Sequence, residues 1–171
     1  MKLFAAISSI LAISAVSAKN YTLPVFNDVG LIYTDKLCGT TPCKETNLYV
    51  QPSYTAHEGN NDDSRILMSF SLVDKKINPS SVSSCMLEFP MSTEGSVLRI
   101  SSVTSAYDAM TVTPDTAPTT GSVIAEKFGT TKIEITEACK TTENGVVSVM
   151  VNAYGMPFHI SAGATRLAVS T

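Results

Sequence analysis

The sequence predicts an all-β protein in which two antiparallel sheets pack face to face as a sandwich. Short alternating runs of Val, Ile, Thr, Ser, Phe and Tyr recur along the chain, and clusters of turn residues separate them at fairly regular intervals. No stretch after residue 18 carries a sustained apolar stripe at helical spacing. With 171 residues, of which 44% are hydrophobic and 16% charged, the composition fits one globular domain.

The alternating runs define the strands that we expect: Phe26–Tyr33, Asn47–Gln51, Arg65–Val73, Ser83–Phe89, Val97–Thr104, Val123–Phe128, Lys132–Ile135, Val146–Ala153 and Thr165–Ser170. One face of Arg65–Val73 carries Ile66, Met68, Phe70 and Leu72. One face of Val146–Ala153 carries Val147, Val149 and Val151, and the other carries Val146, Ser148, Met150 and Asn152. This alternation predicts a core formed by the inward faces of both sheets.

Most segments between the strands are expected to be loops. Thr136–Lys140 is the exception, because it predicts a single helical turn with Thr136 as its N-cap. Gly59–Ser64 reads as a polar loop, and Thr111–Gly121 is a long stretch rich in Thr and Pro. Long loops at the end of a sandwich commonly carry binding sites.

The first 18 residues are expected to be a secretory signal peptide. A lysine precedes an apolar run from Ala5 to Val16, and Val16-Ser17-Ala18 places small residues where a signal peptidase cleaves. A buried N-terminal helix would not explain why the run stops at that site. We therefore expect residues 19–171 to form one secreted domain, extracellular or in a cell wall. Asn20-Tyr21-Thr22 is a sequon that predicts N-glycosylation at Asn20.

All four cysteines follow residue 18, and an even number in a secreted domain indicates two disulfides. Four cysteines allow three pairings. Cys38 and Cys43 bracket the turn-forming Gly39-Thr40-Thr41-Pro42, so we expect Cys38–Cys43 and, by elimination, Cys85–Cys139. A zinc site would need two pairs of closely spaced cysteines, and the sequence has one.

Charge and hydropathy exclude two classes of function. The chain has 12 Lys and Arg against 15 Asp and Glu, with no basic cluster to neutralise a phosphate backbone, so nucleic acid is not an expected partner. The longest apolar stretch is the N-terminal run, which is shorter than the roughly 20 residues that cross a bilayer. An integral membrane protein is therefore not expected either.

The sequence carries no catalytic signature, and we expect no enzymatic activity. His57 and His159 are the only histidines, and neither lies in a G-x-S-x-G or H-E-x-x-H setting. No cofactor is expected. Calcium remains an alternative, since Asp28 and the residues of the polar loop offer oxygen ligands, namely Asn60, Asn61, Asp62 and Asp63. Their spacing does not match a D-x-[DN]-x-[DN]-G loop, so a solvated turn is the preferred interpretation.

The order of several motifs resembles a known family between about residues 27 and 170. Ser64–Leu72 resembles the R-x-L-x-x-F-D-L strand of the DNRLRE domains, which overlap with carbohydrate-binding module family 96. Ile77–Leu87 resembles the connection that follows in that family, and Tyr107–Thr113 stands where the family has W-x-E-x-x-V-T-W. Lys132–Ala138 and Gly145–Asn152 are similar to its last two motifs. Both tryptophans of the family pattern are replaced, by Tyr107 and Pro114.

This resemblance implies a jelly-roll-like β-sandwich that binds carbohydrate without catalysis. In the family such modules accompany enzymes that degrade polysaccharides, and at least one type binds uronic-acid polymers. We therefore expect a secreted module for a uronic-acid or cell-wall polysaccharide. The alternative is a structural or host-interaction protein of a cell wall or extracellular coat that uses the same fold as a packing unit. The sequence leaves the oligomeric state open.

Sugar recognition needs aromatic faces and planar polar side chains, which points to four candidate residues. The chain has no Trp, so tyrosines must supply the rings, and Tyr54 and Tyr107 lie nearest to loops. Arg65 and Arg99 lie in expected strands and could form paired hydrogen bonds with a ligand carboxylate. The alternatives are half-buried core tyrosines and arginines that form ion pairs within the protein.

Overall fold

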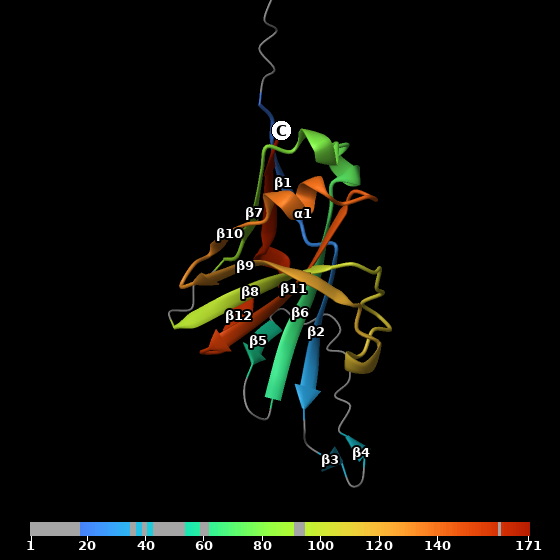
Figure 1. The fold of residues 1–171 in the computed structure, drawn as a ribbon, viewed down its shortest axis with the longest axis vertical. Coiled ribbons are helices and arrows are strands. Elements are labelled where there is room, and N and C mark those ends of the chain that lie inside the picture. Colours follow the sequence, from blue (N-terminus) through green and yellow to red (C-terminus); the bar gives the residue numbers. More distant parts are fainter. Residues whose placement is uncertain are drawn as a thin grey trace, which may run out of the picture.

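The structure is mostly β-strand, in agreement with the predicted fold class (Figure 1). It is a computed structural model that describes residues 18–34, 37–38, 41–42, 54–58, 62–90, 95–160 and 162–171. At residues 32–34, 37–38, 41–42, 54–55, 57, 62–63, 114 and 162 it describes the backbone only. The expected signal peptide and the expected strand Asn47–Gln51 lie outside the described residues, apart from Ala18 at the end of the signal peptide.

Two sheets are formed by strands that are far apart in the sequence. The smaller sheet has the order β1-β13-β7-β10, formed by β1 (Asn20–Pro24), β13 (Arg166–Ser170), β7 (Ser84–Glu88) and β10 (Lys132–Glu134). The seven-stranded larger sheet has the order β12-β5-β6-β11-β8-β9, with β2 also paired to β6. Its strands are β2 (Asn27–Thr34), β5 (Tyr54–Glu58), β6 (Asp62–Ser71), β8 (Ser96–Val103), β9 (Thr120–Phe128), β11 (Val146–Gly155) and β12 (Phe158–Ile160).

Short elements complete the described chain. β3 (Leu37–Cys38) and β4 (Thr41–Pro42) pair as a separate antiparallel ribbon where the turn between Cys38 and Cys43 was expected. The helix α1 spans Thr136–Lys140. The 3-10 turns are Val73–Lys75, Pro79–Ser81, Pro114–Thr116 and Ala162–Ala164.

The main core lies between the two sheets, as the alternation predicts. Ile66, Met68 and Phe70 are fully buried on one face of β6, as is Leu72 directly after it, and Val149 and Val151 of β11 are buried with them in the same cluster. The smaller sheet contributes its inward residues to the same cluster, namely Leu23, Cys85, Leu87, Ile133, Leu167 and Val169. Burial of apolar side chains from both sheets holds the sandwich together.

A second apolar cluster lies on the outer face of the larger sheet, which is the face turned away from the smaller sheet. Leu67 and Met150 project from the middle of this face, and Val29 and Leu31 of β2 join them. Val112 closes over the cluster from the segment 104–119, with Tyr107 packed at its edge. The long Thr- and Pro-rich loop therefore folds back onto the sheet and covers its middle.

The Cys85–Cys139 disulfide is present and joins β7 to α1. The expected Cys38–Cys43 bridge lies outside the described side chains. The expected helical turn is confirmed, but Thr136 is not its N-cap, because Ile135 occupies that position. The Thr136 hydroxyl instead accepts the Cys85 backbone N–H at 3.0 Å and donates to the Glu134 carboxylate at 3.0 Å. Its side chain therefore ties the helix to β7.

The sequence missed β1, β5 and β12, and it placed the start of β6 too late. Asp62 and Asp63, expected in a polar loop, are the first residues of β6 and pair with Thr34 and Tyr33. β1 extends the smaller sheet beside β13, and Lys19 and Thr171 pair next to it, with N···O distances of 3.2 and 3.0 Å. The described chain therefore begins and ends at the same end of the smaller sheet (Figure 1).

Candidate ligand-binding face

The outer face of the larger sheet has three zones along β6 and β11. The middle is covered by the segment 104–119 over Leu67 and Met150. Toward one end, beyond the segment 104–119, lies a group of side chains that we call the open face: Val97, Arg99, Glu126, Phe128, Asn152 and Tyr154 of β8, β9 and β11, together with Glu58 of β5. Toward the other end lies a cleft beside the start of β2.

Strand register brings the polar residues of the open face into one row. Asn152 of β11 pairs with Arg99 of β8, and Arg99 pairs with Glu126 of β9. Residues that pair directly in antiparallel strands point to the same side of the sheet. The inward neighbours Leu98, Ile100, Val151 and Ala153 are buried in the main core, so Arg99 and Asn152 point outward.

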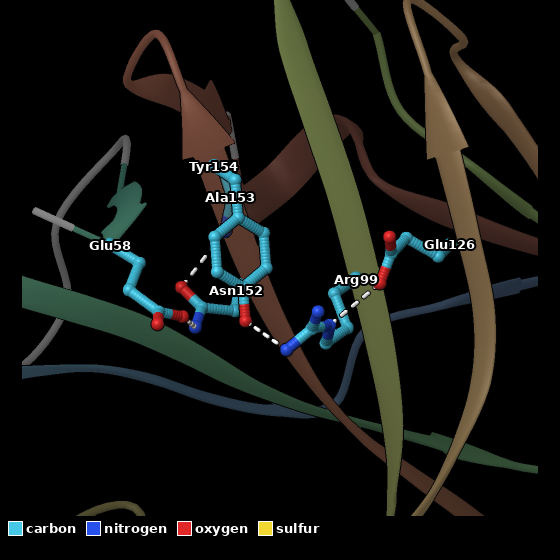
Figure 2. A network of polar contacts seen from close by, with 6 residues as sticks. All are labelled: Glu58, Arg99, Glu126, Asn152, Ala153 and Tyr154. Carbon is cyan, nitrogen blue, oxygen red and sulfur yellow. Dashed lines mark hydrogen bonds and ion pairs between the residues drawn. The ribbon is translucent and has the colours of Figure 1, made fainter.

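These side chains form two adjacent hydrogen-bonded groups (Figure 2). Arg99 Nε donates to Glu126 Oε2 at 2.8 Å, and its Nη1 donates to the Tyr154 hydroxyl. Asn152 Nδ2 donates to Glu58 Oε2 at 2.7 Å, while Asn152 Oδ1 accepts the Ala153 backbone N–H at 2.9 Å. Asn152 is only 8% exposed, so both ends of its amide are satisfied within the protein.

Tyr154 lies at the centre of the network. Figure 2 shows its ring between the side chains of Glu58 and Arg99, and the guanidinium carbon of Arg99 is 4.3 Å from the ring centroid. That distance permits a cation–π attraction. Burial raises the pKa of Tyr154 to about 12, and hydrogen bonding to the Glu58 carboxylate adds to the shift. The hydroxyl is therefore neutral at physiological pH and serves as a fixed hydrogen-bonding group.

An aromatic row runs beside the polar row. Phe128 of β9 pairs with Val97 of β8, which pairs with Tyr154 of β11. The Phe128 side chain is 68% exposed. Neighbouring strands lie about 4.8 Å apart, so the two aromatic residues emerge from the sheet about 10 Å from each other. The open face thus combines two aromatic rings with planar guanidinium, amide and carboxylate groups.

Of the four predicted binding residues, the structure places the two arginines on this outer face. Arg99 lies in the open face, and its exposed ion pair with Glu126 raises the pKa of the guanidinium. Arg65 lies on the same side of β6 as Leu67, at the point where β5 replaces β11 as the neighbour of β6. The alternative of an ion pair within the protein is observed for Arg99, with Glu126. The Tyr54 side chain lies outside the described residues.

The candidate role of Tyr107 in sugar binding requires an exposed ring on a loop, and the structure does not place the ring there. Its ring packs against the second apolar cluster, and burial raises the pKa of its hydroxyl well above the usual range. The hydroxyl accepts from Ser69 Oγ at 3.0 Å and donates to the Asn27 carbonyl at 3.1 Å. The physical reason is the fold of the segment 104–119, which turns back onto Leu67 and Met150 and carries Tyr107 inward.

Sequence reasoning missed most partners of Arg99. The alternation of β11 places Asn152 on the outward face, but only the register shows that Arg99 lies beside it. Glu58 belongs to β5, a strand that the sequence did not predict. Within the described side chains, no group of three or more His, Cys, Asp or Glu could hold a metal ion. Asn60 and Asn61 of the calcium alternative lie outside the described residues.

Comparisons with known proteins add no family assignment. No protein-family model matches the sequence, and no curated protein matches it. Among the described residues, the longest helices are too short to cross a bilayer.

Proposed function

We propose that the chain is a secreted, non-catalytic carbohydrate-binding module with a jelly-roll-like sandwich fold. The open face carries this proposal, because it places Phe128 and Tyr154 on one surface beside the partly exposed side chains of Arg99 and Glu126. Aromatic rings pack against the apolar faces of sugar rings, and planar polar groups bond their hydroxyls. The proposed ligand is a polysaccharide of a cell wall or extracellular matrix.

Uronic-acid polymers belong to the proposed ligand class because of Arg99. A guanidinium binds carboxylates with paired, charge-assisted hydrogen bonds. In the free protein Glu126 already takes this position at 2.8 Å, and both side chains are partly exposed. A ligand carboxylate would replace Glu126, so we expect uronic-acid binding to weaken at high salt.

The covalent features of the chain support secretion. Cys85 and Cys139 are joined, and structural disulfides are typical of oxidising compartments. The sequon residue Asn20 is exposed in β1, where its Oδ1 accepts from Ser170 Oγ at 2.7 Å. That bond uses the amide oxygen and does not involve the amide nitrogen, which is the atom that is glycosylated. Secretion, the Cys38–Cys43 bridge and glycosylation at Asn20 are part of the proposal.

A pull-down with purified, oxidised protein tests the proposal. The panel contains alginate, pectin, chitin, cellulose and β-glucans, each with and without Ca2+. We expect retention on at least one polysaccharide and loss of most of it in Phe128→Ala. Val123→Ala is the matched control, because Val123 is another exposed apolar residue of β9, with 52% exposure. Retention on no polysaccharide, or equal retention of both variants, would contradict binding at the open face.

The exposed edge of the larger sheet favours one alternative, a structural or host-interaction role in a wall or coat. β9 has nine residues, ends the strand order of its sheet and is largely exposed. Such an edge can pair with another strand. This alternative predicts association of the purified protein with increasing concentration, measured by sedimentation, and its loss in Val123→Lys. A protein that stays monomeric would contradict self-association through β9.

A further inference from the structure

The cleft at the other end of the outer face is a separate feature of the molecule. It has a volume of about 610 Å3 and lies between Phe26–Asn27, the segment Thr104–Tyr107 and the loop Thr141–Asn144. Ser69 and Ser148 line it from the sheet. Small-molecule sites typically have volumes of about 300–1,000 Å3. We call this feature the hydroxyl cleft because seven of its lining residues are Ser or Thr and Tyr107 adds a further hydroxyl.

A directed chain of hydroxyl groups lines the hydroxyl cleft. Ser69 Oγ donates its only hydrogen to the Tyr107 hydroxyl at 3.0 Å, and Tyr107 donates to the Asn27 carbonyl at 3.1 Å. The 2.8 Å contact between Ser69 and Ser148 must then use the Ser148 hydrogen. Ser148 Oγ therefore keeps its lone pairs for an incoming donor. The hydroxyl of a polyol is a donor of this kind.

One wall of the hydroxyl cleft is an exposed aromatic ring. Phe26 is 54% exposed, and its backbone N–H is anchored to the Ser69 carbonyl at 3.1 Å. It also borders a smaller hollow of about 140 Å3, outside the hydroxyl cleft, whose lining includes the opposite charges of Asp74 and Lys75. An exposed ring next to fixed hydroxyl groups provides both parts of a sugar site, a stacking surface and hydrogen-bonding groups.

The loop on the opposite wall is already held in place. Asn144 Oδ1 accepts the Val146 backbone N–H at 3.0 Å, and the Thr142 hydroxyl donates to the Val146 carbonyl at 2.8 Å. Less ordering of this loop is then required on binding, which lowers the entropic cost.

The charges of the residues that line the hydroxyl cleft indicate whether it would bind neutral or acidic sugars. Glu143 is the only side chain of the described lining that carries a formal charge at neutral pH. No lysine, arginine or histidine is among these lining residues to balance a ligand carboxylate. A uronic acid would meet the like charge of Glu143 without a compensating cation.

We propose that the hydroxyl cleft is a second ligand site, specific for uncharged sugar residues of a glycan. Its selectivity differs from that of the open face, where Arg99 favours carboxylates. The proposal does not depend on binding at the open face, because the two sites share no residue and the apolar middle of the sheet separates them.

NMR titration of 15N-labelled protein tests this site. Neutral gluco-, manno- and xylo-oligosaccharides should shift the backbone resonances of residues 26–27, 69 and 141–148, whereas oligogalacturonate and oligomannuronate should not. Phe26→Ala should weaken the affinity about tenfold, equivalent to about 1.4 kcal/mol, since it removes the ring on which a sugar would stack. Val123→Ala is the control, because Val123 is an exposed apolar residue that belongs to neither site, and it should leave these shifts unchanged.

The possible outcomes distinguish the two sites. If oligosaccharides shift resonances of the hydroxyl cleft but none of the open face, the proposal for the open face is wrong and the proposal for the hydroxyl cleft stands. Three results would overturn the second site: no cleft shift with any neutral oligosaccharide, cleft shifts with uronates, or equal affinity of Phe26→Ala and the parent protein. Because Phe26 is exposed, Phe26→Ala should fold normally, which its dispersed NMR spectrum will show.

Discussion

Removing the Cys85–Cys139 bridge should be the most damaging change to stability among the cysteine variants. The bridge closes a loop with a sequence separation of 54 residues and joins β7 to α1. In the chain-entropy treatment such a loop contributes about 4 kcal/mol, whereas the short loop of the expected Cys38–Cys43 bridge contributes about 2 kcal/mol. Both Cys85 and Cys139 are fully buried, so truncation also removes core contacts. We therefore expect at least twice the loss of unfolding free energy for the long loop.

The assay compares the double variants Cys85→Ala/Cys139→Ala and Cys38→Ala/Cys43→Ala with the oxidised parent. Unfolding in urea, followed by circular dichroism, gives the unfolding free energy of each protein and its dependence on urea concentration, the m-value. The first variant should lose about 4 kcal/mol or more, and the second about 2 kcal/mol. An equal or larger loss in Cys38→Ala/Cys43→Ala would refute the reasoning from loop length.

Three further changes test other parts of the structure. Phe70→Ala in the fully buried core should cost about 3–5 kcal/mol of unfolding free energy in urea, and a loss under 1 kcal/mol would contradict the packing of the two sheets. Gly155→Ala should destabilise the protein more than Gly129→Ala, because a Cβ at Gly155 would lie 2.6 Å from the Gly95 carbonyl oxygen and one at Gly129 meets nothing within 4 Å; equal melting temperatures would count against this geometry. Tyr154 has a folded-state pKa of about 12 against an unfolded value of 10, so its contribution to stability is complete below pH 10 and is lost as pH rises through 12. Subtracting the ultraviolet titration of Tyr154→Phe from that of the parent protein gives the phenolate absorbance of Tyr154, which should appear near pH 12. Appearance of this absorbance near pH 10 would be inconsistent with the network.

The sequence was sufficient to predict the architecture wherever alternation was strong. Ile66 and Phe70 were expected on an inward face, and both are fully buried in the main core. β12 was missed because three residues are too few for a periodic signal, and β1 because Pro24 interrupts its run. β5 carries the polar sequence Tyr-Thr-Ala-His-Glu, which has no apolar alternation. Such strands are specified by the neighbours with which they pair.

The candidate site was less predictable because it depends on register. Arg99 was expected in a strand with a role in ligand binding or an ion pair, but its neighbours Asn152 and Glu126 come from strands far along the chain. A shift of one residue in either pairing would place them on the opposite face. The side-chain position of Tyr107 in its loop could likewise not be predicted from the sequence. Its position between strands was correct, but the packing of the loop on Met150 decided where its ring lies.

The pairing of β1 with β13 bears on the order of events during synthesis of the chain. Asn20 and Ser170 are partners although 150 residues separate them. Until β13 has been made, β1 has no neighbour in its sheet and Leu23 cannot enter the core. Closure of so long a loop is slow, so the newly made chain should remain incompletely folded until β13 is available. If the chain is secreted as we propose, the peptide bond after Ala18 would stay accessible to a signal peptidase until Lys19 pairs with Thr171.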